Sequence, residues 1–127
     1  MKTIEQEFAE KAYEKTEAYG NGHPKGSAER DKYVGMAQTL PILVRTAGLA
    51  EALAFAESRK ENKDFLEHLA SALGFSTRAD LLRESREAEM REYVYLTRRV
   101  MMALKWFKRF SQSVLDADAA KNNGVQP

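Results

Sequence analysis

The sequence predicts an all-α protein, a compact single-domain bundle of five or six helices with a long C-terminal helix. Apolar residues recur at spacings of three and four through most of the 127 residues, which indicates amphipathic helices. Alternation of apolar and polar residues, which indicates strands, is nearly absent. The length suits one domain with one core. We assign that domain to residues 1–118 and a frayed C-terminal tail to residues 119–127.

The first expected helix covers residues 2–19 and is strongly charged. Ile4 and Phe8 are among its inward positions. Gly20 is expected to end the helix in a left-handed turn, because glycine adopts that conformation without steric cost. The segment 20–27, GNGHPKGS, has the composition of a loop.

Ser27 is a good N-cap for a second helix that extends to about residue 47. Gly48 separates that helix from a third at 49–58. A fourth helix begins at Asn62 or Asp64 and uses an apolar face that ends at Leu73.

Gly74 followed by Phe75 predicts a Schellman end for the fourth helix, with Phe75 folded back on it. Ser76 or Thr77 then caps a short fifth helix.

The sixth helix begins between residues 86 and 90 and extends to about residue 115. At a hundred degrees per residue, one side of this helix is apolar and faces the core. Its opposite side carries cations, which are Arg98, Lys105, Arg109 and, at its start, Arg91. Arg98, Lys105 and Arg109 are the phosphate contacts that we expect first, and the secondary candidates are Arg45, Arg91, Lys108 and Lys25.

Beside this row of cations lie Tyr95, Met102 and Trp106, spaced as one row along the helix. They are too far round the helix to share the main core, so they pack on another helix, a partner chain or a base. For Trp106, a partner protein is at least as good an explanation as base stacking. The cations also have a simpler explanation, since lysine and arginine opposite an apolar stripe often serve only as a solvated face.

The net charge of +1 provides no global attraction to nucleic acid, so any electrostatic function requires segregated charge. Residues 91–112 hold six lysines and arginines against Glu92 alone, whereas residues 2–19 are mainly acidic. A chain with one acidic and one basic side can stack head to tail on copies of itself.

The residue types exclude several classes of site. There is no cysteine, so disulfides and thiolate metal sites are excluded. We found no nucleotide-binding loop, no catalytic constellation and no expected metal or cofactor; His23 lies in a loop and His68 within a helix. No apolar run approaches the roughly 20 residues that cross a bilayer, and no signal peptide is apparent, so we expect a cytoplasmic protein without membrane association.

Two blocks of the sequence carry a resemblance to a known family. They are YVGMAQTLPILVRTAGLAEALAF at 33–55 and YVYLTRRVMMALKWFKRF at 93–110. Together with the leading acidic helix, they resemble the small helical subunit of the Cmr complex, the type III-B CRISPR effector that targets RNA. The resemblance covers nearly the whole chain, but its motifs are patterns of glycine, proline and apolar residues rather than reactive groups.

The resemblance implies a subunit that is not an enzyme. In that family several copies stack into a short filament beside backbone subunits that hold the guide RNA, and the groove between the filaments holds the guide–target duplex. The implied partners are the backbone and large subunits, other copies of the chain, guide RNA and target RNA. A purely structural helical adaptor, which contacts proteins but not RNA, is the alternative.

Overall fold

The computed structural model describes residues 1–115 and confirms the all-α prediction, with no strand in that range. Residues 116–118 of the expected domain and the expected tail at 119–127 lie outside the described residues. The helices are α1 (Ile4–Gly22), α2 (Ala28–Ala47), α3 (Leu49–Glu57), the 3₁₀ helix η1 (Lys60–Asn62), α4 (Lys63–Ala72), α5 (Arg78–Glu87) and α6 (Met90–Ser113).

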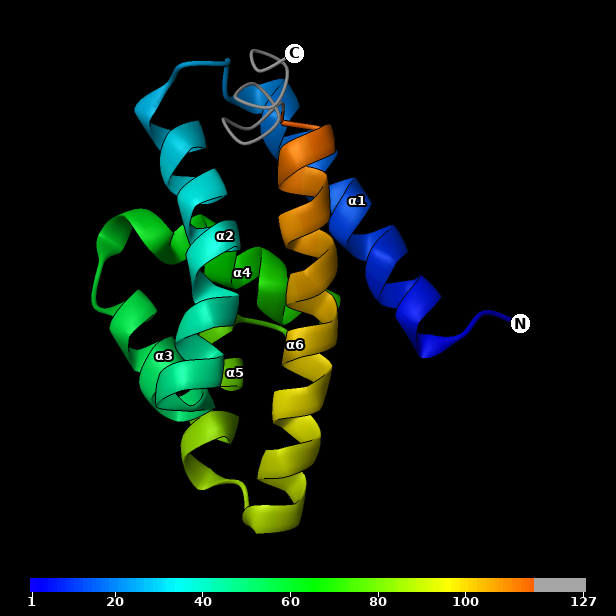
Figure 1. Cartoon of the computed structure of the whole chain (residues 1–127), viewed down its shortest axis with the longest axis vertical. Helices are drawn as coiled ribbons and strands as arrows, with labels where there is room; N and C mark the ends of the chain where they lie inside the picture. Colours follow the sequence, from blue (N-terminus) through cyan, green and yellow to red (C-terminus); the bar gives the residue numbers. More distant parts are fainter. Residues whose placement is uncertain (116–127) are drawn as a thin grey trace.

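Helix α6 is the longest element, and it lies between α2 and α1 in Figure 1. Its most extensive contacts are with these two helices, and α4 also touches it. The shorter helices α3, α4 and α5 pack against one another. In Figure 1, α4 crosses behind α2 and α6, and α3 lies beside the lower part of α2. One side of α6 is therefore surrounded by the bundle, and the opposite side faces solvent.

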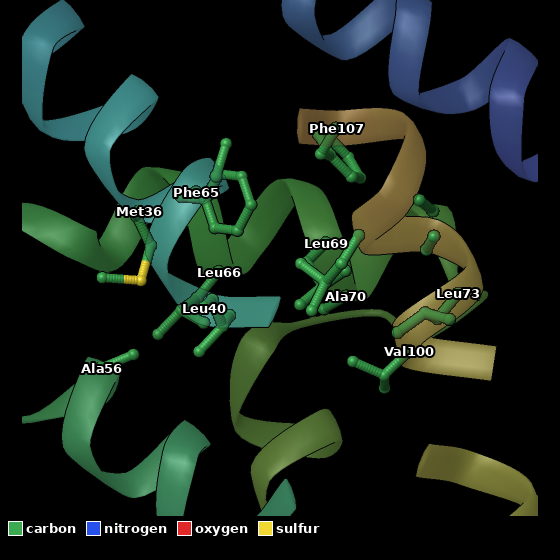
Figure 2. Close-up of a cluster of buried hydrophobic side chains, with 14 of the residues drawn as sticks. Met36, Leu40, Ala56, Phe65, Leu66, Leu69, Ala70, Leu73, Val100 and Phe107 are labelled. Atoms are coloured by element: carbon green, nitrogen blue, oxygen red, sulfur yellow. The ribbon is translucent and has the colours of Figure 1, made fainter. Parts of the chain in front are cut away.

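The core forms where α4 crosses between α2 and α6 (Figure 2). Phe65 of α4 is at its centre, with its ring centroid 5.2 Å from that of Tyr33 and 5.3 Å from that of Phe107, both edge to face. Such aromatic pairs stabilise a core beyond the area that they bury. The core thus fixes the position of α6 through Phe107, on the side that faces away from its cations.

The expected end of the first helix is wrong. α1 continues through Gly20 to Gly22, and Gly20 has no positive φ. Gly20 instead allows a close approach, because a Cβ atom there would lie 2.8 Å from Cδ2 of Leu115. Ile4, expected inward, is 45% exposed because it lies in the first turn of α1, whereas Phe8 is buried as expected.

The expected caps are confirmed. The Ser27 hydroxyl accepts a hydrogen bond from the backbone N–H of Arg30, at the start of α2. The N–H of Phe75 donates to the carbonyl of Ala70 at 2.9 Å, and Gly74 has a φ of +95°, which together make the predicted Schellman end. Local sequence signals therefore placed these helix ends correctly.

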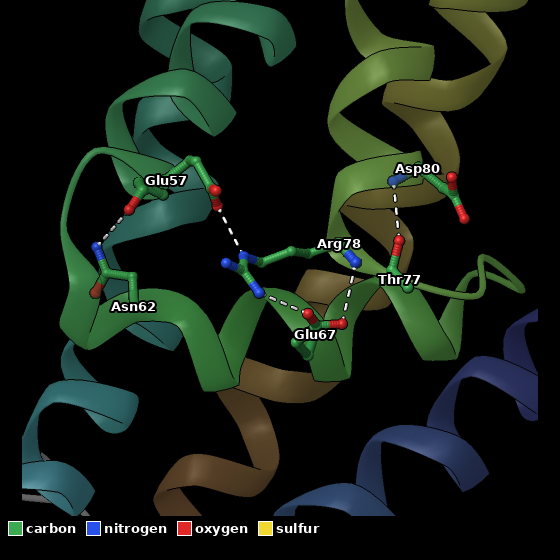
Figure 3. A network of polar contacts seen from close by, with 7 residues as sticks. Glu57, Asn62, Glu67, Thr77, Arg78 and Asp80 are labelled. Carbon is green, nitrogen blue, oxygen red and sulfur yellow. Dashed lines mark hydrogen bonds and ion pairs between the residues drawn. The ribbon is translucent and has the colours of Figure 1, made fainter.

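Thr77 caps α5 through a hydrogen bond from the backbone N–H of Asp80 (Figure 3). Next to it, Arg78 joins three helices. Its Nε donates to Glu57 of α3 at 3.0 Å and its Nη1 to Glu67 of α4 at 2.6 Å. The Glu67 carboxylate also accepts the backbone N–H of Arg78, so it neutralises the positive end of α5.

Candidate nucleic-acid interface

The candidate interface is the side of α6 that faces away from the core. Helix α6 has 24 residues, and its apolar side chains are buried on one side by α1, α2 and α4. The buried residues of α6 are Leu96, Val100, Ala103, Leu104, Phe107 and Ser111. Arg98, Lys105 and Arg109 are exposed on the opposite side, so the helical spacing inferred from the sequence describes α6 correctly.

A groove of about 530 Å³ lies between α2 and α6. Its charged walls are Arg45 from α2 and Lys105, Lys108 and Arg109 from α6. Its other lining residues are Pro41, Met101 and Gln112. Two helices therefore bring four of the predicted cations together, and no carboxylate among residues 1–115 lines the groove.

A second hollow of about 590 Å³ lies on the first half of α6. It is lined by Met90, Arg91, Val94, Tyr95 and Arg98. Arg98 and Lys105 are seven residues apart, which corresponds to about 10 Å along the helix axis. The predicted cations of α6 thus fall into two groups, one with Arg45 of α2 in the first groove and one in the second hollow. We call these sites the α2–α6 groove and the Tyr95 hollow; Lys25 lines neither of them.

Most of these cations have no carboxylate partner within residues 1–115. The ones without an ion pair there are Arg45, Arg91, Arg98, Lys108 and Arg109. Lys105 differs, because its ammonium group forms an ion pair with Glu5 of α1. The hydrogen bond from Lys105 is the main reason why the pKa of Glu5 is lowered. Lys105 is therefore already partly neutralised within its own chain.

The row of Tyr95, Met102 and Trp106 divides in the structure. Met102 and Trp106 are half-buried against the core, whereas Tyr95 is 57% exposed. The Trp106 ring stacks on Phe110 with centroids 5.6 Å apart, and Phe110 meets Tyr13 of α1 edge to face at 5.4 Å. Trp106 thus packs within its own domain, and Tyr95 is the most open of the three. Their role as a partner interface stays a prediction.

Arg99 holds Tyr95 in place, a role that we did not predict from the sequence. Arg99 is half-buried, and its Nη2 donates to the backbone carbonyl of Leu73 at 2.8 Å. Its guanidinium lies over the Tyr95 ring, 5.6 Å from the centroid, and 5.8 Å from the centroid of Phe8. The spacing of four residues between Tyr95 and Arg99 could have indicated this contact, since residues at that spacing are neighbours on a helix.

Both histidines contact tyrosines that are buried in the bundle. The Nδ1 atom of His68 lies 2.7 Å from the Tyr33 hydroxyl, and burial lowers the pKa of His68. His23 stacks on Tyr19 with ring centroids 3.8 Å apart. Within residues 1–115, no group of three or more histidines and carboxylates could hold a metal ion. No helix in that part of the chain is long and apolar enough to cross a membrane.

Comparisons with known proteins agree with the fold and with the resemblance. The family model described as CRISPR-associated protein (Cas_Cmr5) matches residues 4–114. A similar protein is the CRISPR system Cmr subunit Cmr5 of Thermus thermophilus, which is 42% identical over 118 residues, or 91% of this chain and 99% of the relative. A crystal structure of a CRISPR-associated Cmr5 family protein from the same organism superposes with a TM-score of 0.81 at 42% identity, over 90% of this chain and 98% of that one. The chain therefore belongs to the Cmr5 family of CRISPR-associated proteins.

Proposed function

We propose that this protein is a non-catalytic small subunit of a Cmr CRISPR complex and that its α2–α6 groove contacts the backbone of the guide–target RNA. The observation that supports this most directly is the convergence of Arg45, Lys108 and Arg109 in an open groove, with no carboxylate partner among the described residues. The name of the Thermus relative, a Cmr subunit, supports the assignment to a complex.

Backbone contact is what such a groove can provide. In an RNA-guided complex, base pairing between guide and target carries the sequence information, so the protein needs only to recognise charge and shape. Arginine and lysine on rigid helices bind phosphates without reading base edges. Each phosphate neutralised steepens the salt dependence of binding, by about 0.7 to 0.9 in the slope of log K against log salt.

A single copy has few such contacts, so we propose that copies stack into a filament and act together on one RNA. Contacts repeated along one strand raise the overall affinity without any new type of contact. The outer face of α1 carries the exposed carboxylates Glu7, Glu14 and Glu17, and also Glu10, which pairs with Lys2 of its own chain. This acidic face is complementary to the exposed face of α6 on another copy. The proposed partners are copies of the chain, the backbone and large subunits, guide RNA and target RNA.

Charge reversal in the groove tests this proposal. The triple variant Arg45→Glu, Lys108→Glu, Arg109→Glu should keep the helical content, because none of the three side chains has an ion pair among the described residues. We expect weaker retention of target RNA by the reconstituted complex and a shallower salt dependence. The matched control reverses three exposed lysines that do not line the groove, Lys11, Lys32 and Lys60. Equal RNA retention by both variants would sink the proposal.

The second candidate function is a structural adaptor that contacts proteins only. The exposed side chains of Met90, Val94 and Tyr95 favour it, because apolar groups gathered on a surface often mark a protein contact. A salt titration separates the two functions. An adaptor contributes nothing to the salt dependence of RNA retention, whereas a phosphate-binding groove contributes a measurable slope.

A further inference from the structure

The Tyr95 hollow contains exposed groups that the fold does not require. Met90, Val94 and Tyr95 are 82%, 42% and 57% exposed, although α6 already buries a full apolar side against the core. Arg91 and Arg98 lie in the same hollow and have no ion pair within residues 1–115. An open aromatic ring next to two unpaired guanidinium groups is a combination typical of single-strand binding.

The Tyr95 ring is held in place from behind. Arg99 covers one face of the ring at 5.6 Å and is itself fixed by its hydrogen bond to the Leu73 carbonyl. Phe8 of α1 lies beside the same guanidinium, at 5.8 Å. The orientation of the ring is thus set by groups of the protein, while more than half of the side chain stays accessible. A ring that is ordered in advance loses little conformational entropy when a ligand stacks on it.

We propose that Tyr95 stacks on an unpaired base of an RNA strand, while Arg91 and Arg98 contact phosphates on either side of that base. The two arginines are seven residues apart, or about 10 Å along the helix axis, which leaves room for one nucleotide between them. This inference rests on the proposed function and adds to it a preference for unpaired bases. The α2–α6 groove, which no aromatic side chain of the described residues lines, has no such preference.

The charges favour RNA over a protein partner at this hollow. The same exposed side of α6 continues from Arg98 to Lys105 and Arg109, so one strand could contact both groups of cations. Glu92 is the only carboxylate on α6. A protein ligand would need carboxylates along this whole row, whereas a nucleic acid strand supplies a negative charge at every nucleotide.

The test compares an RNA strand with a strand that lacks bases. The full-length protein binds a labelled oligouridylate of about 12 nucleotides, a length within the range of single-strand sites, and an abasic strand of equal length, both at low salt. Fluorescence anisotropy measures each dissociation constant. We expect the base-containing strand to bind roughly tenfold tighter, which is within the range of one base–aromatic stack. Tyr95→Leu should abolish this preference, and Tyr95→Phe should keep it.

Tyr13→Leu is the matched control, because Tyr13 is 43% exposed on α1 and lies away from the hollow. Photocrosslinking adds a measurement on the unaltered protein, so it does not depend on how a variant folds. Oligouridylate that carries 5-iodouracil should crosslink to Tyr95, and mass spectrometry identifies the site. Crosslinks that form at other aromatic residues but not at Tyr95 would overturn the inference.

The outcomes separate this inference from the function on which it rests. If the wild-type protein binds both strands equally, or Tyr95→Leu weakens both equally, the stacking role is wrong, although the groove variant can still weaken both strands and support phosphate binding. If Tyr95→Leu leaves both affinities unchanged and instead prevents incorporation into the reconstituted complex, Tyr95 contacts a protein subunit and the inference is overturned. If the groove variant leaves RNA binding unchanged, the proposed function fails.

Discussion

Seven of the arginines of this protein form two sets that occupy different regions. At the junctions between helices, each arginine bonds to groups of other elements; we call Arg30, Arg78 and Arg99 the junction arginines. On the outer faces of α6 and α2, the side chains are exposed and have no ion pair within residues 1–115; we call Arg45, Arg91, Arg98 and Arg109 the open arginines. The comparison indicates that the same residue type stabilises the fold in one region and is available to a ligand in the other.

The largest effect on stability should come from Arg30. Its guanidinium donates to the carbonyls of Gly20 at 3.4 Å, His23 at 2.9 Å and Leu115 at 3.0 Å. It thus provides hydrogen-bond donors to carbonyl groups at the C-terminal ends of α1 and α6. The last carbonyl groups of a helix have no partner within the helix itself. We expect Arg30→Met to lower the free energy of unfolding by about 2 kcal/mol, since each bond to a charged donor is worth more than a neutral one.

Urea unfolding measures this change, and Arg109→Met is the control. Arg109 is exposed and has no ion pair within the described residues, so its substitution should change stability by less than about 0.5 kcal/mol. Similar losses for the two variants would remove the distinction between junction and open arginines.

Arg78 should have the next largest effect. It connects α3, α4 and α5 through Glu57 and Glu67, and its side chain is 26% exposed. Partial exposure reduces the value of both ion pairs, so we expect Arg78→Met to cost about 1 kcal/mol. Arg83 is the matched control in the same helix, because its pair with Asp80 is local and its side chain is 53% exposed. Arg83→Met should leave the urea midpoint nearly unchanged, and an equal shift would argue against the role of Arg78 as a junction.

The third prediction concerns the protonation of His68 in the interior of the bundle. His68 lies at the interior junction, where burial, and then Lys15, lower its pKa below the ordinary value. Well above its ordinary pKa of about 6.5, the imidazole is neutral in both the folded and the unfolded chain. As the pH falls below this value the unfolded chain binds a proton first, so the stability that the neutral imidazole contributes is lost.

Thermal unfolding should therefore show a midpoint that decreases between about pH 7 and pH 5. His68→Gln keeps an acceptor for the Tyr33 hydroxyl and removes this titration, so its midpoint should depend less on pH over the same range. An unchanged pH dependence in the variant would show that His68 is not the group responsible.

The sequence predicted the open arginines better than the junction arginines, for a physical reason. The face of α6 follows from helical spacing alone, so the exposure of Arg98 and Arg109 could be predicted without tertiary contacts. The partners of Arg30 and Arg78 come from other parts of the chain, up to 85 positions away in the case of Leu115, and no local pattern indicates them. The ion pair of Lys105 with Glu5 escaped prediction for the same reason, because it joins residues 100 positions apart.

The comparison also explains where the helix ends were predicted correctly. The Gly74–Phe75 end depends on a left-handed residue and on bonds within six residues, so the sequence contains all that it needs. Gly20 is also a glycine, but its role is to allow close contact with Leu115 after the end of α6. A glycine at a long-range contact cannot be distinguished from a glycine in a turn by sequence alone.

The smallest expected effect concerns Lys105, a lysine that shares one property with each set of arginines. It lines the α2–α6 groove like an open cation, yet it pairs with Glu5 like a junction cation. Because both partners are exposed, water and salt screen their attraction, and Glu5→Gln should leave the unfolding midpoint nearly unchanged. The same substitution releases Lys105 for phosphate, so RNA affinity at low salt should rise by about twofold.

The matched control for this prediction is Glu84→Gln, which removes one exposed carboxylate from α5 at a position that lines neither the groove nor the hollow. Both variants raise the net charge equally, so a general electrostatic effect would raise RNA affinity equally in both. A larger gain for Glu5→Gln, together with a steeper salt dependence, would mean that the pair with Glu5 limits Lys105. Equal gains would mean that Lys105 contributes to RNA binding only through net charge, and the groove would then depend on its unpaired cations alone.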